Sequence, residues 1–165
     1  METYQAEVLV NERFHLSEGP VWDAETGVLH FVDIKGCTVN TYRLSDGLRT
    51  STEVNQNVGC FALRRQGGYI LGLTAGVYLR SEDGRRIEKL TEPVYDPMTR
   101  SNDGKCDPQG RFWCGTSDLV KGEKRGKLYL LPGDGRCIEM LDRLEISTGM
   151  GIAGDTLYFI DSARH

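Results

Sequence analysis

The sequence predicts an all-β protein built as an open arc of β-propeller blades. Three observations lead to this prediction: short apolar runs bounded by turn residues, the absence of sustained helical periodicity, and a repeated strand–turn–strand pattern. The chain has 165 residues, of which 39% are hydrophobic and 27% are charged. This length and composition are typical of one folded domain with its own core.

The repeated pattern consists of a strand, a turn and a second strand. The stretches that follow it begin at a glycine, and they are 19–33, 59–73, 104–115 and 149–161. A third strand that ends at an Asp-Gly turn follows the first three of these stretches. The expected third strands are 37–43, 76–80 and 127–131.

The period of the repeat identifies it as a propeller blade. The leading glycines lie 40, 45 and 45 residues apart, and several strands within such a period are the signature of a blade. We expect blades over about 13–55, 56–98 and 99–145, with an incomplete fourth over 146–165. Since propellers close with about four to eight blades, we expect this arc of three and a half blades to be a fragment of a longer protein. The alternatives are that it pairs with another copy through its open edges or that it is a marginally stable product.

The stretch from Arg100 to Thr116 places a polar cluster directly ahead of a hairpin. Arg100 offers a fork of donors, and Asn102 carries both a donor and an acceptor. Residues 107–110 read as the hairpin turn, with a proline and a glycine at the positions that a turn favours. The sequence therefore predicts a ligand site at the start of the third blade.

Charge and cysteine content exclude several classes of protein. The net charge is −4 and the basic residues are scattered, so nucleic acid is not an expected partner. We find neither a secretory signal pattern nor an apolar run of 18 residues, and we predict a cytoplasmic protein without membrane contact. The five cysteines lack C-x-x-C spacing and are expected to be reduced thiols in or near strands.

Four motifs together resemble those of one known family. They are Leu-Ser-Glu-Gly-Pro-Val-Trp-Asp at 16–23, Leu-His-Phe-Val-Asp-Ile at 29–34, the 100–116 stretch with its Ser-Asn-Asp-Gly-Lys, and Leu-Tyr-Phe-Ile-Asp-Ser at 157–162. The chain resembles the family of senescence marker protein, regucalcin, gluconolactonase and luciferin-regenerating enzyme. The resemblance implies a six-bladed propeller of the lactonase type, of which this chain would end inside the fourth blade.

The resemblance also implies a site in the central tunnel. Family members bind one divalent metal there, namely calcium, zinc, manganese or magnesium, and many hydrolyse sugar lactones. The metal-binding Glu of the family falls on Glu18, and a metal-binding Asn falls on Thr148, which keeps an oxygen but has a shorter reach. The substrate-binding residues fall on Arg100 and Asn102. The general-base Asp would lie beyond His165, so no catalytic residue is assigned.

The expected function is that of a metal-dependent sugar-lactone hydrolase of the gluconolactonase type. One carboxylate and one hydroxyl are few ligands for a cation that takes about six to eight oxygens, so weak or no activity is expected of the short chain. The substrate Glu of the family has no equivalent here, although Asp118 is close. The alternative is a non-catalytic binding or scaffold protein in which partial propellers associate to complete a ring.

Several of these residues also have a purely structural interpretation. Glu18 could lie in a solvated turn, and Asp103 is expected to make local backbone hydrogen bonds in a turn rather than bind a ligand. The aromatic residues Trp22, Phe112 and Trp113 alternate with polar residues, so we expect them in the blade core rather than on a sugar-binding surface.

Overall fold

The computed structural model describes residues 3–91 and 96–163, and these residues form β-strands without any helix, as predicted. The first two sheets consist of β1 (Ser17–Asp23), β2 (Val28–Asp33), β3 (Thr38–Arg43), β4 (Arg49–Glu53), β5 (Val58–Leu63), β6 (Tyr69–Leu73), β7 (Gly76–Arg80) and β8 (Ile87–Thr91). The remaining strands are β9 (Thr99–Cys106), β10 (Phe112–Asp118), β11 (Gly126–Leu131), β12 (Ile138–Leu144), β13 (Ser147–Ala153) and β14 (Thr156–Asp161).

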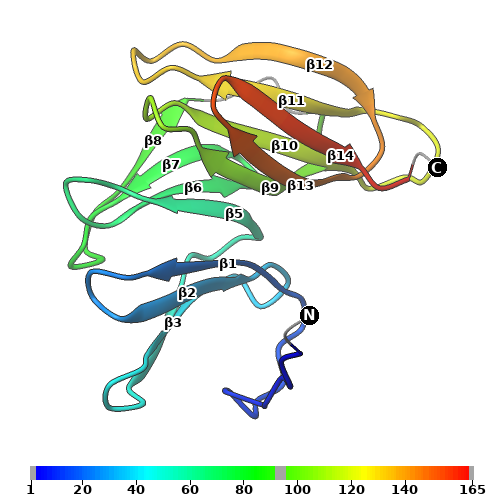
Figure 1. Ribbon diagram of the computed structural model, residues 1–165. Coiled ribbons are helices and arrows are strands. Elements are labelled where there is room, and N and C mark those ends of the chain that lie inside the picture. Colours follow the sequence, from blue (N-terminus) through cyan, green and yellow to red (C-terminus); the bar gives the residue numbers. More distant parts are fainter. Residues whose placement is uncertain (1–2, 92–95, 164–165) are drawn as a thin grey trace.

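The strands form three four-stranded antiparallel sheets and one hairpin. Within each sheet the strands pair in chain order, β1 to β4, β5 to β8 and β9 to β12, and β13 pairs with β14. The sheets follow one another in space as they do in the chain (Figure 1). Strands β1, β5, β9 and β13, which we call the inner strands, contact one another in that order. This arrangement is the predicted series of blades.

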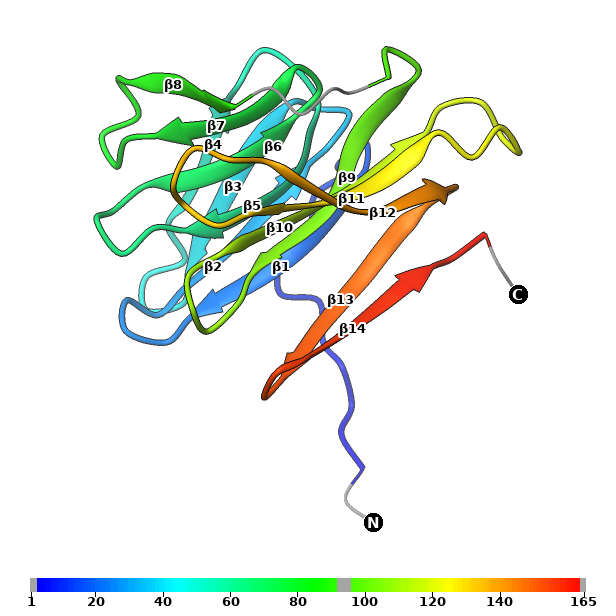
Figure 2. The ribbon, with the colours of Figure 1, turned by 90° about the horizontal axis from the view of Figure 1, so that it is seen from above.

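The hydrophobic core lies between successive sheets. The first cluster joins sheets β1–β4 and β5–β8 and includes Val32, Val58 and Leu71, all with 0% exposure. The next two clusters lie on either side of the third sheet. Seen from above, the β13–β14 hairpin lies beyond the third sheet, away from β2 and β3 (Figure 2). Because the second and third sheets each pack on a neighbour at both faces, apolar side chains are needed on both faces of these two sheets.

A backbone hydrogen bond closes every blade in the same way. The amide that follows the second strand donates to the carbonyl that precedes the inner strand. The four bonds are Ile34 N to Leu16 O at 2.9 Å, Thr74 N to Asn57 O at 3.1 Å, Leu119 N to Met98 O at 2.8 Å and Ser162 N to Ile146 O at 3.0 Å. The repeat inferred from the sequence is therefore present in the hydrogen bonds as well.

Aspartates at the end of the second strand reinforce this closure in two blades. Asp33 accepts from the amides of His15 and Leu16 at 2.9 and 2.8 Å. Asp161 accepts in the same way from Glu145 and Ile146, at 3.1 and 2.9 Å. Each carboxylate thus ties the segment that enters a blade to the strand that lies beside it.

Every inner strand is also irregular near its beginning. The pairing shifts at Gly19–Pro20 in β1, at Gly59 in β5, at Asn102 in β9 and at Thr148–Gly149 in β13. We call these positions the inner bulges. The sequence repeat had placed Gly104 in the series of leading glycines, but the third inner bulge falls on Asn102. A bulge redirects the side chains beside it, and the predicted site residues lie at or next to three of the four.

The aromatic residues divide between the core and the surface. Phe112 and Trp113 are 2% and 9% exposed, as predicted for blade core. The prediction is wrong for Trp22, which is 51% exposed. Successive residues of a strand point to opposite faces, and in β1 it is Val21 that packs against the core. The five cysteines are free thiols, as expected.

Candidate functional site

The candidate site is built around Asn102, the third inner bulge. Its side-chain amide donates to the carbonyl of Ser147 at 2.7 Å and lies 3.3 Å from the hydroxyl of Thr148. Its Oδ1 accepts from Arg100 Nη1 at 2.7 Å. The structure therefore brings Arg100, Asn102 and Thr148 together, and Asn102 is the link between them.

Arg100 is a half-buried cation at the start of β9. Its Nη1 also donates to the carbonyl of Ser101 at 2.9 Å, which fixes the orientation of the planar guanidinium. Burial lowers the pKa of Arg100, and the charge of the nearby Glu18 opposes this shift. An arginine stays protonated even so. The carboxylate of Glu18 is exposed, so this end of the site carries one fixed cation and one accessible anion.

Asp103 connects the candidate site to the neighbouring inner strand, β13. Its Oδ1 accepts from the amide of Gly104 at 2.8 Å, which is the local bond expected from the sequence. Its Oδ2 accepts from the amide of Gly149 at 2.7 Å, in the neighbouring inner strand. Asp103 lies within strand β9 rather than in a turn, so the turn expected there is absent. Its carboxylate positions the bulge that carries Thr148.

Asp118 is not placed to contact a substrate. Its side chain is fully inaccessible, and it accepts from the amides of Val120 and Arg125 at 3.0 and 3.2 Å. The guanidinium of Arg125 lies 3.7 Å from the same carboxylate. Asp118 ends the second strand of its blade, as Asp33 and Asp161 do in theirs. Asp118 therefore has a structural role, in which its carboxylate accepts hydrogen bonds from backbone amides of the segment after β10.

The described residues supply few ligands for a metal ion. The hydroxyl of Thr148 lies beside the amide of Asn102 and 3.4 Å from the hydroxyl of Ser162, so it is already in a hydrogen-bonded group. Over residues 3–91 and 96–163 there is no group of three or more His, Cys, Asp or Glu side chains that could hold a metal. Glu18 and Thr148 alone do not make up a divalent-metal site.

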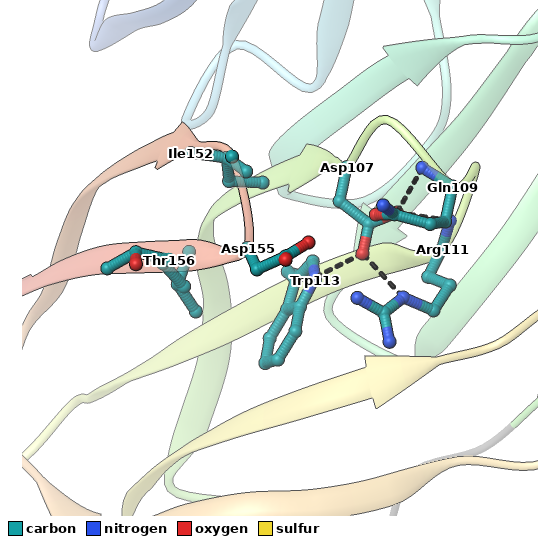
Figure 3. A pocket seen from close by; sticks show the side chains of 9 residues that line it. Asp107, Gln109, Arg111, Trp113, Ile152, Asp155 and Thr156 are labelled. Carbon is teal, nitrogen blue, oxygen red and sulfur yellow. Dashed lines mark hydrogen bonds and ion pairs between the residues drawn. The ribbon is translucent and has the colours of Figure 1, made fainter.

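A hollow lies at the other end of β9 and β10, away from Asn102, where the turn 107–110 is found as predicted. It has a volume of about 100 Å³. Figure 3 shows Asp107 receiving hydrogen bonds from Trp113 and Arg111; Asp155 lines the same hollow. The bond from Trp113 Nε1 is 3.0 Å and that from Arg111 Nε is 2.6 Å. This carboxylate serves the fold, because its oxygens are already occupied by protein donors.

One residue that positions the site was missed from the sequence. Ser101 is 1% exposed, accepts from the amide of Gly59 at 3.2 Å and donates to the carbonyl of Gly72 at 2.5 Å. These bonds join the second and third blades just beside Asn102. The only signal in the sequence was a serine between Arg100 and Asn102, which gives no indication of its partners about 30 to 40 positions away.

Comparison with known proteins agrees with this architecture. Residues 16–165 match the family model described as the SMP-30/gluconolactonase/LRE-like region. A 6-deoxy-6-sulfogluconolactonase of Pseudomonas putida is 33% identical over 91% of this chain and 53% of its own length. Regucalcin of Xenopus laevis is 34% identical over 98% of this chain and 57% of its own. The chain thus spans about half the length of these curated relatives.

Solved structures show the same fold. A luciferin-regenerating enzyme superposes with a TM-score of 0.84 at 29% identity, covering 92% of this chain and 54% of that one. A calcium-binding regucalcin of Agrobacterium tumefaciens superposes with a TM-score of 0.87 at 24% identity, covering 94% and 54%. The described residues include no helix that could cross a membrane. The predicted lactonase-type β-propeller is confirmed, and the chain belongs to the SMP-30/gluconolactonase/LRE-like family.

Proposed function

We propose that this chain supplies the sugar-binding part of a lactone hydrolase site, with an aldonolactone such as gluconolactone as the substrate. The observation that carries the proposal is the half-buried guanidinium of Arg100, fixed by its hydrogen bond to Asn102, with the exposed Glu18 close enough for its charge to act on the guanidinium. Membership of the family supports it, as does the likeness to a sulfogluconolactonase.

Hydrolysis of a lactone requires water to attack the ring carbonyl. The carbonyl oxygen gains negative charge and the ring C–O bond breaks, which leaves one open-chain hydroxy acid whose carboxyl group releases a proton. Arg100 has five N–H donors, and in the described part of the chain its side-chain hydrogen bonds all come from Nη1. The remaining donors can orient sugar hydroxyls or stabilise the developing oxyanion. In this proposal Asn102 fixes Arg100, and its Oδ1 accepts a further hydrogen bond from the sugar.

The proposal extends to a divalent cation, with Glu18 and Thr148 as two of its ligands. A bound cation would polarise the lactone carbonyl as a Lewis acid. The described residues do not complete such a site, so the role assigned to this chain is to bind and orient the sugar. We therefore expect clear binding of a lactone analogue but turnover close to the uncatalysed rate.

Binding can be tested with a gluconolactam, an analogue in which nitrogen replaces the ring oxygen and hydrolysis is slow. In an NMR titration we expect it to shift the guanidinium signals of Arg100 and to bind at least about tenfold more weakly to the Arg100→Gln variant. The matched control is Arg136→Gln, an exposed arginine in the β11–β12 turn. Equal binding by the parent and the Arg100→Gln variant would contradict the proposal.

Turnover is a separate measurement. Acid release from gluconolactone is followed with calcium, zinc, manganese or magnesium, with and without the chain, against a blank that contains only the cation. A rate equal to the blank, together with binding of the lactam, is the expected result. A metal-dependent rate that Glu18→Gln abolishes would show instead that the chain holds a working metal site.

A second candidate function is association of two copies into a larger ring. It is favoured by apolar side chains exposed on the two outermost sheets: Trp22 on β1 is 51% exposed, and Tyr158 and Ile160 on β14 are 62% and 58% exposed. Exposed apolar surface of this kind often marks an interaction site. Light scattering tests this candidate, since a monomer at concentrations of about 100 μM would contradict it.

A further inference from the structure

A groove separate from the candidate site lies between the second and third sheets. It has a volume of about 510 Å³, within the range of about 300 to 1,000 Å³ that is usual for small-molecule sites. It lies where the turns of the β5–β6 and β9–β10 hairpins approach each other. The residues that line it are Leu63, Arg64, Arg65, Gln66, Ile70, Leu79, Leu90, Cys106, Gln109, Gly110, Phe112, Leu131 and Gly133. We call it the interblade groove.

The interblade groove is distant from the candidate site around Asn102. Arg100 is the second residue of β9, whereas Cys106, which lines the groove, is the last residue of the same strand. At about 3.3 Å per residue, six residues of strand separate the two by roughly 20 Å. The two sheets that form the groove lie next to each other in the ribbon (Figure 1). A ligand in the groove would therefore not occupy the site around Asn102.

The floor of the groove is apolar. Leu79, Leu90 and Cys106 are partly buried and pack on the core cluster that contains Phe112 and Leu131. These side chains come from both sheets, so the groove is a place where the core between two blades opens to the surface. A hydrocarbon group laid along this floor would remove apolar surface from water, which favours binding.

The rim of the groove is cationic. Arg64 and Arg65 lie in the β5–β6 turn, which is fixed by the bonds Arg64 N to Gly68 O at 3.1 Å and Gly67 N to Arg64 O at 2.9 Å. Within the part of the chain that the structure describes, neither guanidinium forms an ion pair. Glu82 borders this turn at Gly67 but does not line the groove.

We propose that the interblade groove binds an amphipathic monocarboxylate, such as a medium-chain fatty acid. The carboxylate would pair with the two arginines, which match its planar geometry. The alkyl chain would lie on the floor formed by Leu79, Leu90 and Cys106. Both halves of the ligand are required, because the rim accepts the charge and the floor accepts the chain.

Titration calorimetry with three eight-carbon probes tests each half of the ligand. We expect octanoate to bind, octanol to bind at least about tenfold more weakly and octylamine not to bind, because a tenfold change corresponds to the loss of one strong charge-assisted contact. Acetate, which has the charge but not the chain, should also fail to bind. Equal affinity for octanoate and octylamine would show that the rim has no role and would overturn the proposal.

Variants of the rim locate the site. Arg64→Gln combined with Arg65→Gln should weaken octanoate binding at least about tenfold. The matched control, Arg85→Gln combined with Arg86→Gln, removes the same charge from an exposed turn that does not line the groove, and should bind like the parent. In the parent, octanoate should shift the methyl NMR signals of Ile70, Leu79 and Leu90. Unchanged methyl signals, or equal loss of binding in both double variants, would refute the assignment.

Discussion

The carboxylate of Asp103 accepts a hydrogen bond from the amide of Gly149 at 2.7 Å, which links inner strands that are 46 residues apart in the chain. Its other oxygen is taken by the amide of Gly104. Asparagine has the same shape but only one acceptor oxygen, so Asp103→Asn must leave one of the two amides facing an NH₂ group. Together with the bond from Asn102 to the carbonyl of Ser147, this contact fixes how the third and fourth inner bulges lie relative to each other.

We predict that Asp103→Asn lowers the free energy of unfolding by about 1 to 3 kcal/mol, the usual cost of an unsatisfied partner. Urea denaturation measures this change. Asp155→Asn is the control, because Asp155 is exposed and no hydrogen bond of its side chain is found in the described part of the chain. Equal stability of the two variants would show that the Asp103–Gly149 bond contributes little.

His30 should make the protein less stable in weakly acidic solution. It is 8% exposed, and its Nδ1 lies 2.9 Å from the hydroxyl of Tyr69. Burial lowers the pKa of His30 below its ordinary value of 6.5, and the charge of Asp23 opposes this only in part. The folded state therefore binds the proton less readily than the unfolded chain, and stability falls as the pH drops below 6.5.

The expected loss is at most about 1.4 kcal/mol per pH unit between pH 6.5 and the lowered pKa of the folded state. Urea denaturation at pH 7.5, 6.5 and 5.5 measures it. His30→Gln should flatten the dependence over this range, whereas His15→Gln, at an exposed histidine, should keep it. A parent protein that is equally stable at all three values would refute the prediction.

Gly59 should tolerate no side chain. A Cβ atom at this position would overlap the backbone carbonyl of Ser101, which cannot move without disturbing β9. We predict that Gly59→Ala costs at least about 1 to 3 kcal/mol of unfolding free energy, as overpacking usually does. Gly151→Ala is the control, since the nearest atom to its Cβ would be the Cβ of Tyr158 at 3.9 Å. Thermal unfolding of both variants by circular dichroism tests this, and similar midpoints would contradict it.

Asp107 should keep Trp113 buried until the solution becomes strongly acidic. Burial by itself would raise the pKa of Asp107, but hydrogen bonds from Trp113 and Arg111 hold the pKa below its ordinary value of 3.8. The stability that these bonds provide is therefore present above pH 3.8 and is lost as the pH falls through the lowered pKa.

For Asp107→Asn we expect a loss of about 2 to 4 kcal/mol, because a charged acceptor of several bonds is replaced by an amide that also donates. Fluorescence of Trp113, recorded in a Trp22→Phe background so that only the buried indole reports, should shift to longer wavelength at a lower urea concentration. An unchanged midpoint would mean that the carboxylate is not needed to hold the ring.

The blade architecture could be predicted because local patterns encode it. Short apolar runs, turn glycines and a period near 45 residues are properties of neighbouring positions, and the sheets follow them closely. The glycine pattern pointed to Gly104 as the start of the third repeat, whereas the position of the bulge is set by the pairing of β9 with β10 at Asn102. Pairing between strands is not visible in the periodicity of one strand.

The contacts of the site could not be predicted in the same way. Motif resemblance named Arg100, Asn102, Glu18 and Thr148, but the hydrogen bond from Asn102 to the carbonyl of Ser147 joins backbone and side chain across 45 positions. Such a bond depends on the packing of two blades, to which any residue type contributes a carbonyl. The roles of these four residues, the blade limits 13–55, 56–98, 99–145 and 146–165, and the cytoplasmic location stay predictions.

The inner bulges have a consequence for how this architecture can diversify during evolution. Three of them carry or adjoin side chains that can be exchanged, because a bulge is outside the regular ladder and a substitution there leaves the sheet pairing intact. The bulge at Gly59 cannot accept a side chain, because the backbone of Ser101 occupies the space that a Cβ atom would need. New chemistry in a descendant of this chain would thus arise at the three inner bulges near Glu18, Asn102 and Thr148. The inner bulge at Gly59 would stay unchanged.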